Sequence, residues 1–455
     1  MNETAPTEQG ELRYQRDRPL SAVPGYAVGL QLTLASGEAV YVALSATELV
    51  LYFQKQLAIH FDLEARLVKV AELDHYWRRS LSHWVVFSRK RAAAEGGGLD
   101  RVVLDETEAD RLVRESNAAV LSVWQEVEAG KATFTLGKPN IPGALERITP
   151  LLRRAAAFDV VTARRDASRF AAIYRSVAVL PPNEYNALVL QATEGCCYNH
   201  CAFCQLYKGV HFHAKDPAEF GEHLHSVIEY HGASLAARRS LFLGEANALT
   251  IPQRDLVADL QLIREHFELP APEQTQVDAG WWLGRANRFD GIGSFLDIFT
   301  GTPRSVAEWT ELHRLGLRRV YIGMESGSED LLQWLRKPAT VPGLTRTVTA
   351  LKDARLTVAV IVLLGAGGRQ FAEAHVRETA RVINSLPLSR GDYIYLSPLV
   401  IYPGGQYDAI ALQESITPLT PAEIDAQEQE LRAGLQLARR GNPYIARYDL
   451  ETFTY

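Results

Sequence analysis

The sequence predicts an α/β protein: an open, parallel (β/α)6 partial barrel, preceded by an N-terminal α+β domain and followed by a C-terminal helix. Three observations predict this fold class. The chain has 455 residues, more than one ordinary domain needs. Beyond Pro181 and Pro182, short apolar runs alternate with amphipathic helical patterns, which is typical of parallel βαβ units. Six such units are fewer than the eight of a closed barrel, so we expect an open one.

The composition is that of an ordinary globular protein, with 47% hydrophobic and 22% charged residues. The formal net charge of −6 provides no basic surface for phosphate groups, which disfavours a nucleic-acid partner without excluding one. Residues 1–19 are polar and lack the apolar segment of a signal peptide. No stretch approaches the roughly 18 uninterrupted apolar residues of a membrane span. We therefore expect a soluble, cytoplasmic protein that does not contact membranes.

Residues 1–180 contain no cysteine and are predicted to form a mixed α+β domain of unknown role. Alternating apolar residues over 28–34 and 39–44, joined by a turn at Ser36-Gly37, predict a hairpin. Helical periodicity follows in three segments, 47–60, 107–128 and 143–157. The double proline at 181–182 ends this domain, because neither residue continues a helix.

Residues 181–410 carry the repeated strand and helix pattern. Six apolar runs predict its strands: 187–193, 240–244, 296–300, 319–323, 357–364 and 392–396. The intervening helices have capping signals such as Asp216-Pro-Ala-Glu219, in which an acidic N-cap, a proline and a glutamate satisfy free amide groups. The C-terminal extension, 411–455, is predicted to hold one more helix, from Thr420 to Gly441, with a single apolar face.

Chemically distinctive residues follow the predicted strands, where loops can vary while the scaffold stays packed. They are Cys197, Gly244-Glu245, Thr300, Glu325-Ser326 and the segment 365–368. Because the carboxyl ends of parallel strands meet at one edge of a sheet, we expect these loops to converge on one rim.

Three of the four cysteines lie within eight residues, in the run Cys197-Tyr-Asn-His-Cys201-Ala-Phe-Cys204. Thiolates crowded on one loop can hold an iron–sulfur cluster, and three ligands would leave one iron of a four-iron cluster free. A zinc site is the alternative, and its fourth ligand would come from Cys196, His200, His211 or His213. Purely structural thiols are a third interpretation. A disulfide framework is disfavoured, because a chain of this size can bury its own core.

Residues 185–410 resemble the radical SAM superfamily, and in particular the subgroup whose members are described only as radical SAM proteins. Three segments carry the resemblance: TEGCCYNHCAFCQLYK at 193–208, LGEANA at 243–248 and YIGMESGS at 321–328. The cysteine motif in its predicted barrel is specific, whereas the glycine-containing segments alone would be weak.

The resemblance implies two cofactors. Cys197, Cys201 and Cys204 would hold a [4Fe-4S] cluster, whose free iron would chelate the amino and carboxylate groups of S-adenosyl-L-methionine (SAM). The implied SAM-binding residues are Phe203, Gly244, Glu245, Asn247, Glu325, Ser326, Gly365 and Gly367.

The family's pattern implies a role for most of these residues. Phe203 would pack beside the adenine, and Gly244 and Glu245 would receive the methionine ammonium group. Glu325 would meet the ribose or the methionine carboxylate. The segment 365–367 would support the adenine by close backbone approach, which small residues allow.

The resemblance further implies an enzyme that reductively cleaves SAM at the cluster to a 5′-deoxyadenosyl radical, which abstracts a hydrogen atom from an unidentified substrate. The implied partner is a one-electron donor such as flavodoxin or ferredoxin, and the reaction class is that of an oxidoreductase or a transferase. No residue is assigned a catalytic role toward the substrate.

The sequence also departs from parts of the family. A second cluster is disfavoured because only Cys196 is left over. Leu206 stands where the oxygen-independent coproporphyrinogen oxidases have a further cysteine. The N-terminal part has no cobalamin-binding Asp-x-His-x-x-Gly signature. The rival interpretations are a zinc-dependent enzyme that uses the same cysteines and a non-enzymatic iron–sulfur binding or sensing protein.

Two features have both a functional and a structural interpretation. Cys196 is expected to be a small buried residue beside the motif rather than a ligand. The long connection 277–295 contains Trp281, Trp282, Arg285 and Arg288. It would form either a lid or substrate wall, which an expected position near the rim favours, or a loop that packs on the N-terminal domain.

Overall fold

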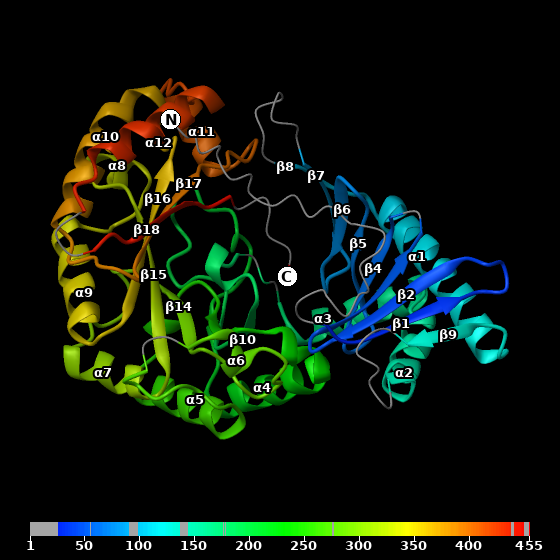
Figure 1. Cartoon of the computed structure of the whole chain (residues 1–455). Coiled ribbons are helices and arrows are strands. Elements are labelled where there is room, and N and C mark those ends of the chain that lie inside the picture. Colours follow the sequence, from blue (N-terminus) through cyan, green and yellow to red (C-terminus); the bar gives the residue numbers. More distant parts are fainter. Residues whose placement is uncertain are drawn as a thin grey trace, which may run out of the picture.

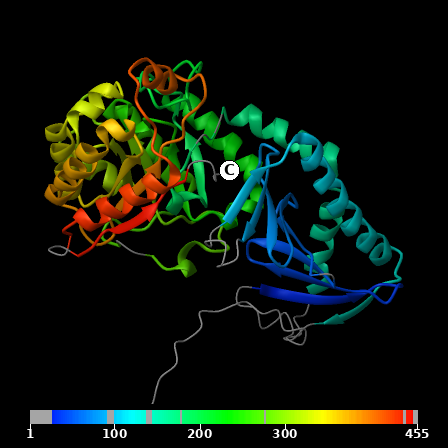
Figure 2. The same ribbon diagram turned by 90° about the horizontal axis from the view of Figure 1, so that it is seen from above.

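The computed structural model of the chain describes residues 26–54, 56–90, 99–136, 144–175, 177, 179–274, 277–437, 441–449 and 455. The polar segment 1–19 lies outside these residues. The described residues form two lobes that lie side by side, one built on an antiparallel sheet and one on a parallel sheet (Figures 1 and 2).

The first lobe is built, in the described part of the chain, on a nine-stranded antiparallel sheet of order β8-β7-β6-β5-β4-β3-β2-β1-β9. Its strands are β1 (Tyr26–Thr33), β2 (Ala39–Ser45), β3 (Glu48–Phe53), β4 (Ala58–Asp62), β5 (Leu67–Ala71), β6 (His75–Arg79), β7 (Val85–Lys90), β8 (Leu99–Val103) and β9 (Thr133–Leu136). The pairing of β1 with β2, in which Leu30 lies opposite Val42, confirms the predicted hairpin. The helices α1 (Glu106–Glu128) and α2 (Ala144–Ala156) confirm two predicted helices, and α3 (Val160–Ile173) leads to the second lobe.

The helix predicted at 47–60 is wrong, because β3 and β4 occupy this segment. Leu49, Val50 and Leu51 are all fully buried, so neighbouring residues on opposite faces of β3 are apolar. A strand of this kind lacks the two-residue alternation of a half-buried strand, and periodicity alone does not distinguish it from a helix.

The second lobe is, over the described residues, a seven-stranded sheet in which every neighbouring pair is parallel, with the order β10-β13-β14-β15-β16-β17-β18. Its strands are β10 (Ala187–Gln191), β13 (Ser240–Gly244), β14 (Ile292–Leu296), β15 (Leu317–Glu325), β16 (Thr357–Leu364), β17 (Tyr393–Pro398) and β18 (Tyr444–Arg447). The main helices are α4 (Pro217–His231), α5 (Gln253–His266), α7 (Val306–Arg314), α9 (Val341–Asp353), α10 (Gly368–Ser385) and α12 (Pro421–Gly434). In Figure 1 the helices follow one another in an arc, with the strands on its inner side. The α/β class with an open parallel sheet is therefore confirmed.

The third strand lies earlier than predicted, at β14 rather than at 296–300. Gly293 and Ser294 interrupt its apolar run, but both are required by their surroundings. A Cβ at Gly293 would come within 3.0 Å of the Glu184 carboxylate, and the buried Ser294 hydroxyl donates to the Leu243 carbonyl oxygen at 2.7 Å.

The prediction that the C-terminal extension contains only a helix is wrong. The helix α12 ends at Gly434 rather than Gly441, and β18 then adds a further parallel strand beside β17. This four-residue strand is half exposed and has no long apolar run, so its sequence gives a weak signal. Backbone pairing with β17 forms it.

Side chains cover the edge of the sheet at β10. The Tyr174 hydroxyl donates to the Val189 carbonyl oxygen at 3.0 Å, and the Val189 amide donates to the Tyr455 hydroxyl at 2.9 Å. The Gln191 amide donates to Nε2 of His223 at 2.9 Å. These contacts satisfy backbone groups that an open edge would otherwise present to another strand.

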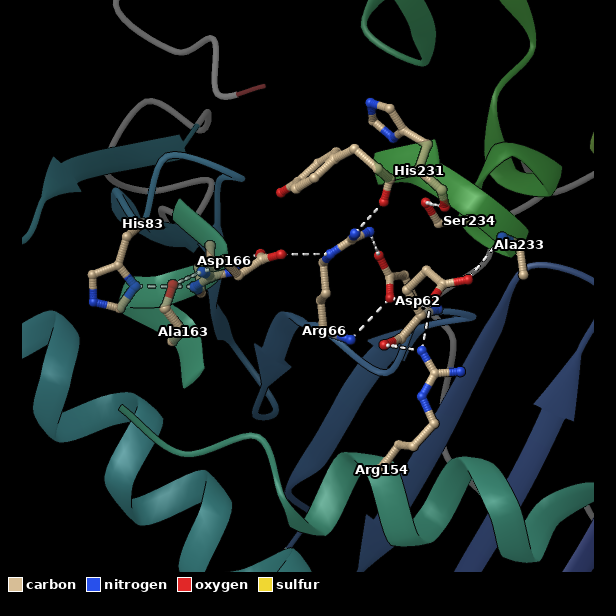
Figure 3. A network of polar contacts seen from close by, with 12 residues as sticks. Asp62, Arg66, His83, Arg154, Ala163, Asp166, His231, Ala233 and Ser234 are labelled. Carbon is tan, nitrogen blue, oxygen red and sulfur yellow. Dashed lines mark hydrogen bonds and ion pairs between the residues drawn. The ribbon is translucent and has the colours of Figure 1, made fainter. Parts of the chain in front are cut away.

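Charged and polar groups join the two lobes (Figure 3). Buried Arg66, in the turn after β4, donates through Nε to Asp166 at 2.9 Å and through Nη1 to Asp62 at 3.3 Å. Its Nη2 donates to the carbonyl oxygen of Tyr230 in α4, and the guanidinium lies 4.3 Å from the Tyr230 ring centroid. Glu64 accepts from the Ala233 amide at 2.8 Å. The first lobe is thereby fixed to the carboxyl end of α4.

Within the described ranges, every helix is too short or too polar to cross a bilayer.

Candidate functional site

The cysteine loop follows β10 and lies between the short strands β11 (Thr193–Glu194) and β12 (His213–Ala214). Cys196, Cys201 and Cys204 line a pocket at the carboxyl ends of the parallel strands. These three thiols are half-buried, and Cys197 is exposed. The loop therefore lies at the predicted rim, with Cys196 at the pocket wall rather than in the core.

The thiols differ in their surroundings. The Cys196 thiol donates to Cys197 and lowers the pKa of Cys197 to about 5, and the same contact raises the pKa of Cys196. Burial raises the pKa of Cys201 to about 11, and burial also raises the pKa of Cys204. Among the described residues, no three His, Cys, Asp or Glu side chains converge on one metal-ion position. Cysteine thiolates are the ligands of iron–sulfur clusters, and they also bind zinc.

Asn247 and Asp297 connect the second and third strands to the cysteine loop. Nδ2 of Asn247 lies 3.4 Å from Sγ of Cys197 and 2.5 Å from a carboxylate oxygen of Asp297. The Asp297 amide donates back to Oδ1 of Asn247 at 3.0 Å, and the Thr300 hydroxyl lies 2.7 Å from the Asp297 carboxylate. Sγ of Cys197 lies 3.4 Å from the hydroxyl oxygen of Thr300. This polar cluster surrounds one side of Cys197.

A buried ion pair forms the other charged part of the pocket. Nζ of Lys337 donates to Oε1 of Glu325, at the end of β15, at 2.7 Å. Burial alone would lower the pKa of Lys337, but the nearby Glu325 carboxylate raises it overall, so Lys337 is a cation. Its Nζ lies 5.9 Å from the ring centroid of Phe203 and 5.7 Å from that of Phe299. A Cβ at Gly323 would come within 2.5 Å of Glu325, so glycine leaves room for the pair.

Glu245 is buried beside the start of the cysteine loop and outside the pocket lining. Its carboxylate accepts from Nε2 of Gln191 at 2.7 Å and from the Gly195 amide at 3.1 Å. Burial raises the pKa of Glu245 to about 7. The predicted contact of Glu245 with a ligand stays a prediction, and its observed contacts are with the loop.

The predicted residues Gly244, Ser326, Gly365 and Gly367 also lie outside the pocket lining. The hydroxyl of Ser326 bonds to Nδ1 of buried His375 at 2.8 Å. The amide of Gly365 donates to Gln427 at 2.7 Å, and that of Gly367 donates to the Tyr407 hydroxyl at 3.0 Å. Of the predicted SAM-binding residues, Phe203, Asn247 and Glu325 are the ones that line the pocket.

Two charged residues of the pocket, Asp297 and Lys337, are absent from the predicted site. Asp297 fell within the misplaced third strand, although a carboxylate directly after a correctly placed strand would have been a signal. Lys337 follows the short helix α8 (Glu329–Trp334), where no pattern distinguishes it from a surface lysine.

The aromatic connection lies at the opposite end of the sheet, because it precedes β14. Within it, α6 (Ala279–Trp282) is followed by a turn at Gly284, where a Cβ would come within 2.6 Å of Ala46 in the first lobe. Arg288 lies 4.8 Å from the Trp281 ring centroid and pairs with Glu268 at 2.7 Å. The sequence-based preference for a lid is wrong, and the loop packs against the first lobe.

Comparisons with known proteins give limited similarity. No protein-family model matches the sequence, and no curated protein matches it. Three solved structures have low similarity to the chain. The first is TsrM, a radical S-adenosylmethionine methyltransferase from Kitasatospora setae. The others are coproporphyrinogen III oxidase (HemN) from Escherichia coli, described as a radical SAM enzyme, and the archaeal Elp3 protein from Methanocaldococcus infernus.

The identities of these structures to the chain are 18%, 14% and 11%, and the TM-scores are 0.34, 0.38 and 0.37. The matches cover 52%, 59% and 58% of this chain. The chain spans 38% of TsrM, 54% of HemN and 55% of Elp3. Similarity at this level does not assign an activity.

Proposed function

We propose that the chain is a radical SAM enzyme, in which Cys197, Cys201 and Cys204 hold a [4Fe-4S] cluster and the adjoining pocket binds SAM. The observation that carries the proposal is the position of the CxxxCxxC loop. This loop follows the first strand of a parallel sheet and borders a pocket at the carboxyl ends of the strands. In sheets of this kind, such ends are where ligands bind.

The polar groups of the pocket suit the amino acid end of SAM. Lys337 offers a buried cation to a carboxylate, while Asp297 and Glu325 offer carboxylates to an ammonium group or to ribose hydroxyls. Phe203 offers an aromatic face to the adenine. When bound, the cluster and SAM would supply one-electron chemistry that breaks C–H bonds resistant to acid–base catalysis.

The rest of the pocket suits this chemistry because its apolar lining disfavours water. Its other walls are mostly apolar, and they include Phe295, Ile361 and Leu363. A dry site protects reactive species from side reactions. The proposed partners are a one-electron donor such as flavodoxin or ferredoxin and an unidentified substrate. The first lobe is proposed to help define that substrate, and the proposed compartment is the cytoplasm.

Anaerobic reconstitution with iron and sulfide tests the proposal. The expected product is a coloured protein with about four irons per chain, which forms 5′-deoxyadenosine when SAM and a reductant are added. Replacing Cys197, Cys201 or Cys204 by alanine should abolish both properties. Cys196→Ala is the matched control, because Cys196 adjoins the same loop, and it should keep most of both.

Three outcomes would contradict the proposal. Bound zinc in place of iron would indicate a zinc-dependent enzyme. A cluster that never cleaves SAM would indicate a binding or sensing protein. Equal loss in the Cys196→Ala variant would overturn the assignment of the three ligands.

A further inference from the structure

The pocket beside the cysteine loop has two chemically different parts. Its charged side chains, over the described residues, are Asp297, Glu325 and Lys337, and they all lie beyond or at the carboxyl ends of the strands. Further down the strands, side chains of alternate residues point into the same space. The apolar part includes Val179, Phe295, Tyr321, Ile361 and Tyr448.

The two tyrosines of the apolar part present their rings rather than their hydroxyls. The Tyr321 hydroxyl donates to the Glu184 carboxylate at 2.7 Å and accepts from Nδ2 of Asn183 at 2.6 Å. The Tyr448 hydroxyl donates to the Leu180 carbonyl oxygen at 2.8 Å. Both hydroxyls are therefore hydrogen-bonded to groups of the protein itself.

Tyr448 also shows how the chain builds this part of the pocket. It directly follows β18, and its amide donates to the Leu396 carbonyl oxygen of β17 at 2.9 Å. The hydroxyl of Ser397, another lining residue, donates to the Tyr448 carbonyl oxygen at 2.8 Å. The segment after β18 thus places an aromatic wall between β17 and the segment at Val179 and Leu180.

A charged substrate group would have no counter-ion in the apolar part. Tyr207 also lines the pocket, and burial raises the pKa of its phenol well above its ordinary value, so this wall residue is neutral. Transfer of an unpaired charge from water into these apolar surroundings costs far more free energy than its transfer to the charged end of the pocket. Transfer of an apolar group into the same surroundings is favourable.

We infer that the apolar part of the pocket takes an uncharged, largely apolar substrate, such as an aromatic or alicyclic hydrocarbon skeleton. This inference rests on the proposed function for the assignment of the polar end to SAM. It deepens that function by naming the substrate class: nucleotides and phosphorylated sugars would leave unpaired charges against Phe295 and Ile361.

The test uses the full reconstituted protein and two fluorescent probes that share one aromatic skeleton. N-phenyl-1-naphthylamine is uncharged, and 8-anilinonaphthalene-1-sulfonate is the same skeleton with an anionic sulfonate group. Titrations are run with and without SAM, and no reductant is added. We expect N-phenyl-1-naphthylamine to bind at one site per chain in both conditions, and to bind at least about tenfold more tightly than the sulfonate.

Variants locate the probe. Val179→Phe fills the apolar part, whereas Val161→Phe makes the same change at an exposed position of α3. The first variant should weaken binding of N-phenyl-1-naphthylamine severalfold, and the second should leave it unchanged. Ile361→Asp places a carboxylate in the apolar part and should weaken binding by about tenfold or more. Circular dichroism verifies that each variant is folded.

Tighter binding of the sulfonate, or equal affinity of the uncharged probe for the Val179→Phe and Val161→Phe variants, would overturn the inference. These titrations require no SAM cleavage, so their result is independent of 5′-deoxyadenosine formation. A protein that cleaves SAM but binds no uncharged probe would refute the substrate class and retain the proposed function. A protein that binds the probe at this site but holds no cluster would refute the proposed function alone.

Discussion

Asp259 is a carboxylate on α5 whose environment opposes its charge. It is fully buried, and neither carboxylate oxygen has a hydrogen-bond partner. Burial, followed by repulsion from Asp255 and Asp216, raises the pKa of Asp259 from 3.8 to about 7. The folded state therefore holds a proton that the unfolded state releases at lower pH.

Because the folded-state pKa is raised, the contribution of Asp259 to stability is fully present below pH 3.8 and is lost as the pH rises to about 7. Asp259→Asn removes this loss. The variant should gain about 3 kcal/mol more over the wild type at pH 8 than at pH 5, as measured by urea unfolding. Glu265→Gln, an exposed change on the same helix, is the control and should show no such difference. An Asp259→Asn gain independent of pH would contradict the raised pKa.

At the scale of elements, the parallel strands could be predicted where both faces are buried. In β10, Ala187, Leu188, Val189 and Leu190 are all buried, which gives an uninterrupted apolar run. The strands β14 and β18 escaped prediction because tertiary contacts determine them. A close approach requires Gly293 in β14, and pairing with β17 forms the short β18.

The candidate site was predictable to the extent that it follows a local motif. The spacing of the cysteines indicated the loop, and Phe203, Asn247 and Glu325 line the pocket beside it. Lys337 could not be predicted, because its importance arises from an ion pair formed across the fold. Gly365 and Gly367 lie outside the pocket lining. Their amides donate to the side chain of Gln427 and to the hydroxyl of Tyr407.

Glu245 is a buried carboxylate that contacts the start of the cysteine loop. Glu245 accepts from the Gly195 amide, one residue before Cys196, and so fixes where the loop leaves the sheet. Glu245→Ala should lower the iron content of the reconstituted protein several-fold, an effect comparable to the loss of a residue that orients metal ligands. Glu245→Gln keeps one carbonyl oxygen as acceptor and should retain most of the iron.

The measurement is iron per chain, together with SAM affinity. If Glu245→Ala keeps its iron and loses only SAM affinity, Glu245 binds SAM and does not hold the loop.

At the scale of the whole molecule, the two lobes are coupled through buried charges. Arg66 compensates Asp62 and Asp166 and reaches α4 of the second lobe (Figure 3). Arg66→Ala would leave two buried carboxylates without their main partner, which should cost about 3–5 kcal/mol. We expect differential scanning calorimetry to show one transition for the wild type and two for Arg66→Ala, because the lobes of the variant unfold separately.

The matched control is Arg89→Ala, since Arg89 forms an exposed ion pair with Asp100 at 3.4 Å. Exposed pairs contribute little, so this variant should unfold as the wild type does. A single, unshifted transition in Arg66→Ala would show that other contacts hold the lobes together.

In the proposed site, three cysteine ligands leave one iron of the cluster open for SAM beside the charged end of the pocket. Electron paramagnetic resonance of the anaerobically reduced protein, recorded before and after addition of SAM, shows whether SAM reaches this iron. We expect the signal of a reduced four-iron cluster that changes when SAM binds, and that is lost in the Cys201→Ala variant. A protein without an iron–sulfur signal, or with a signal that SAM leaves unchanged, would contradict it.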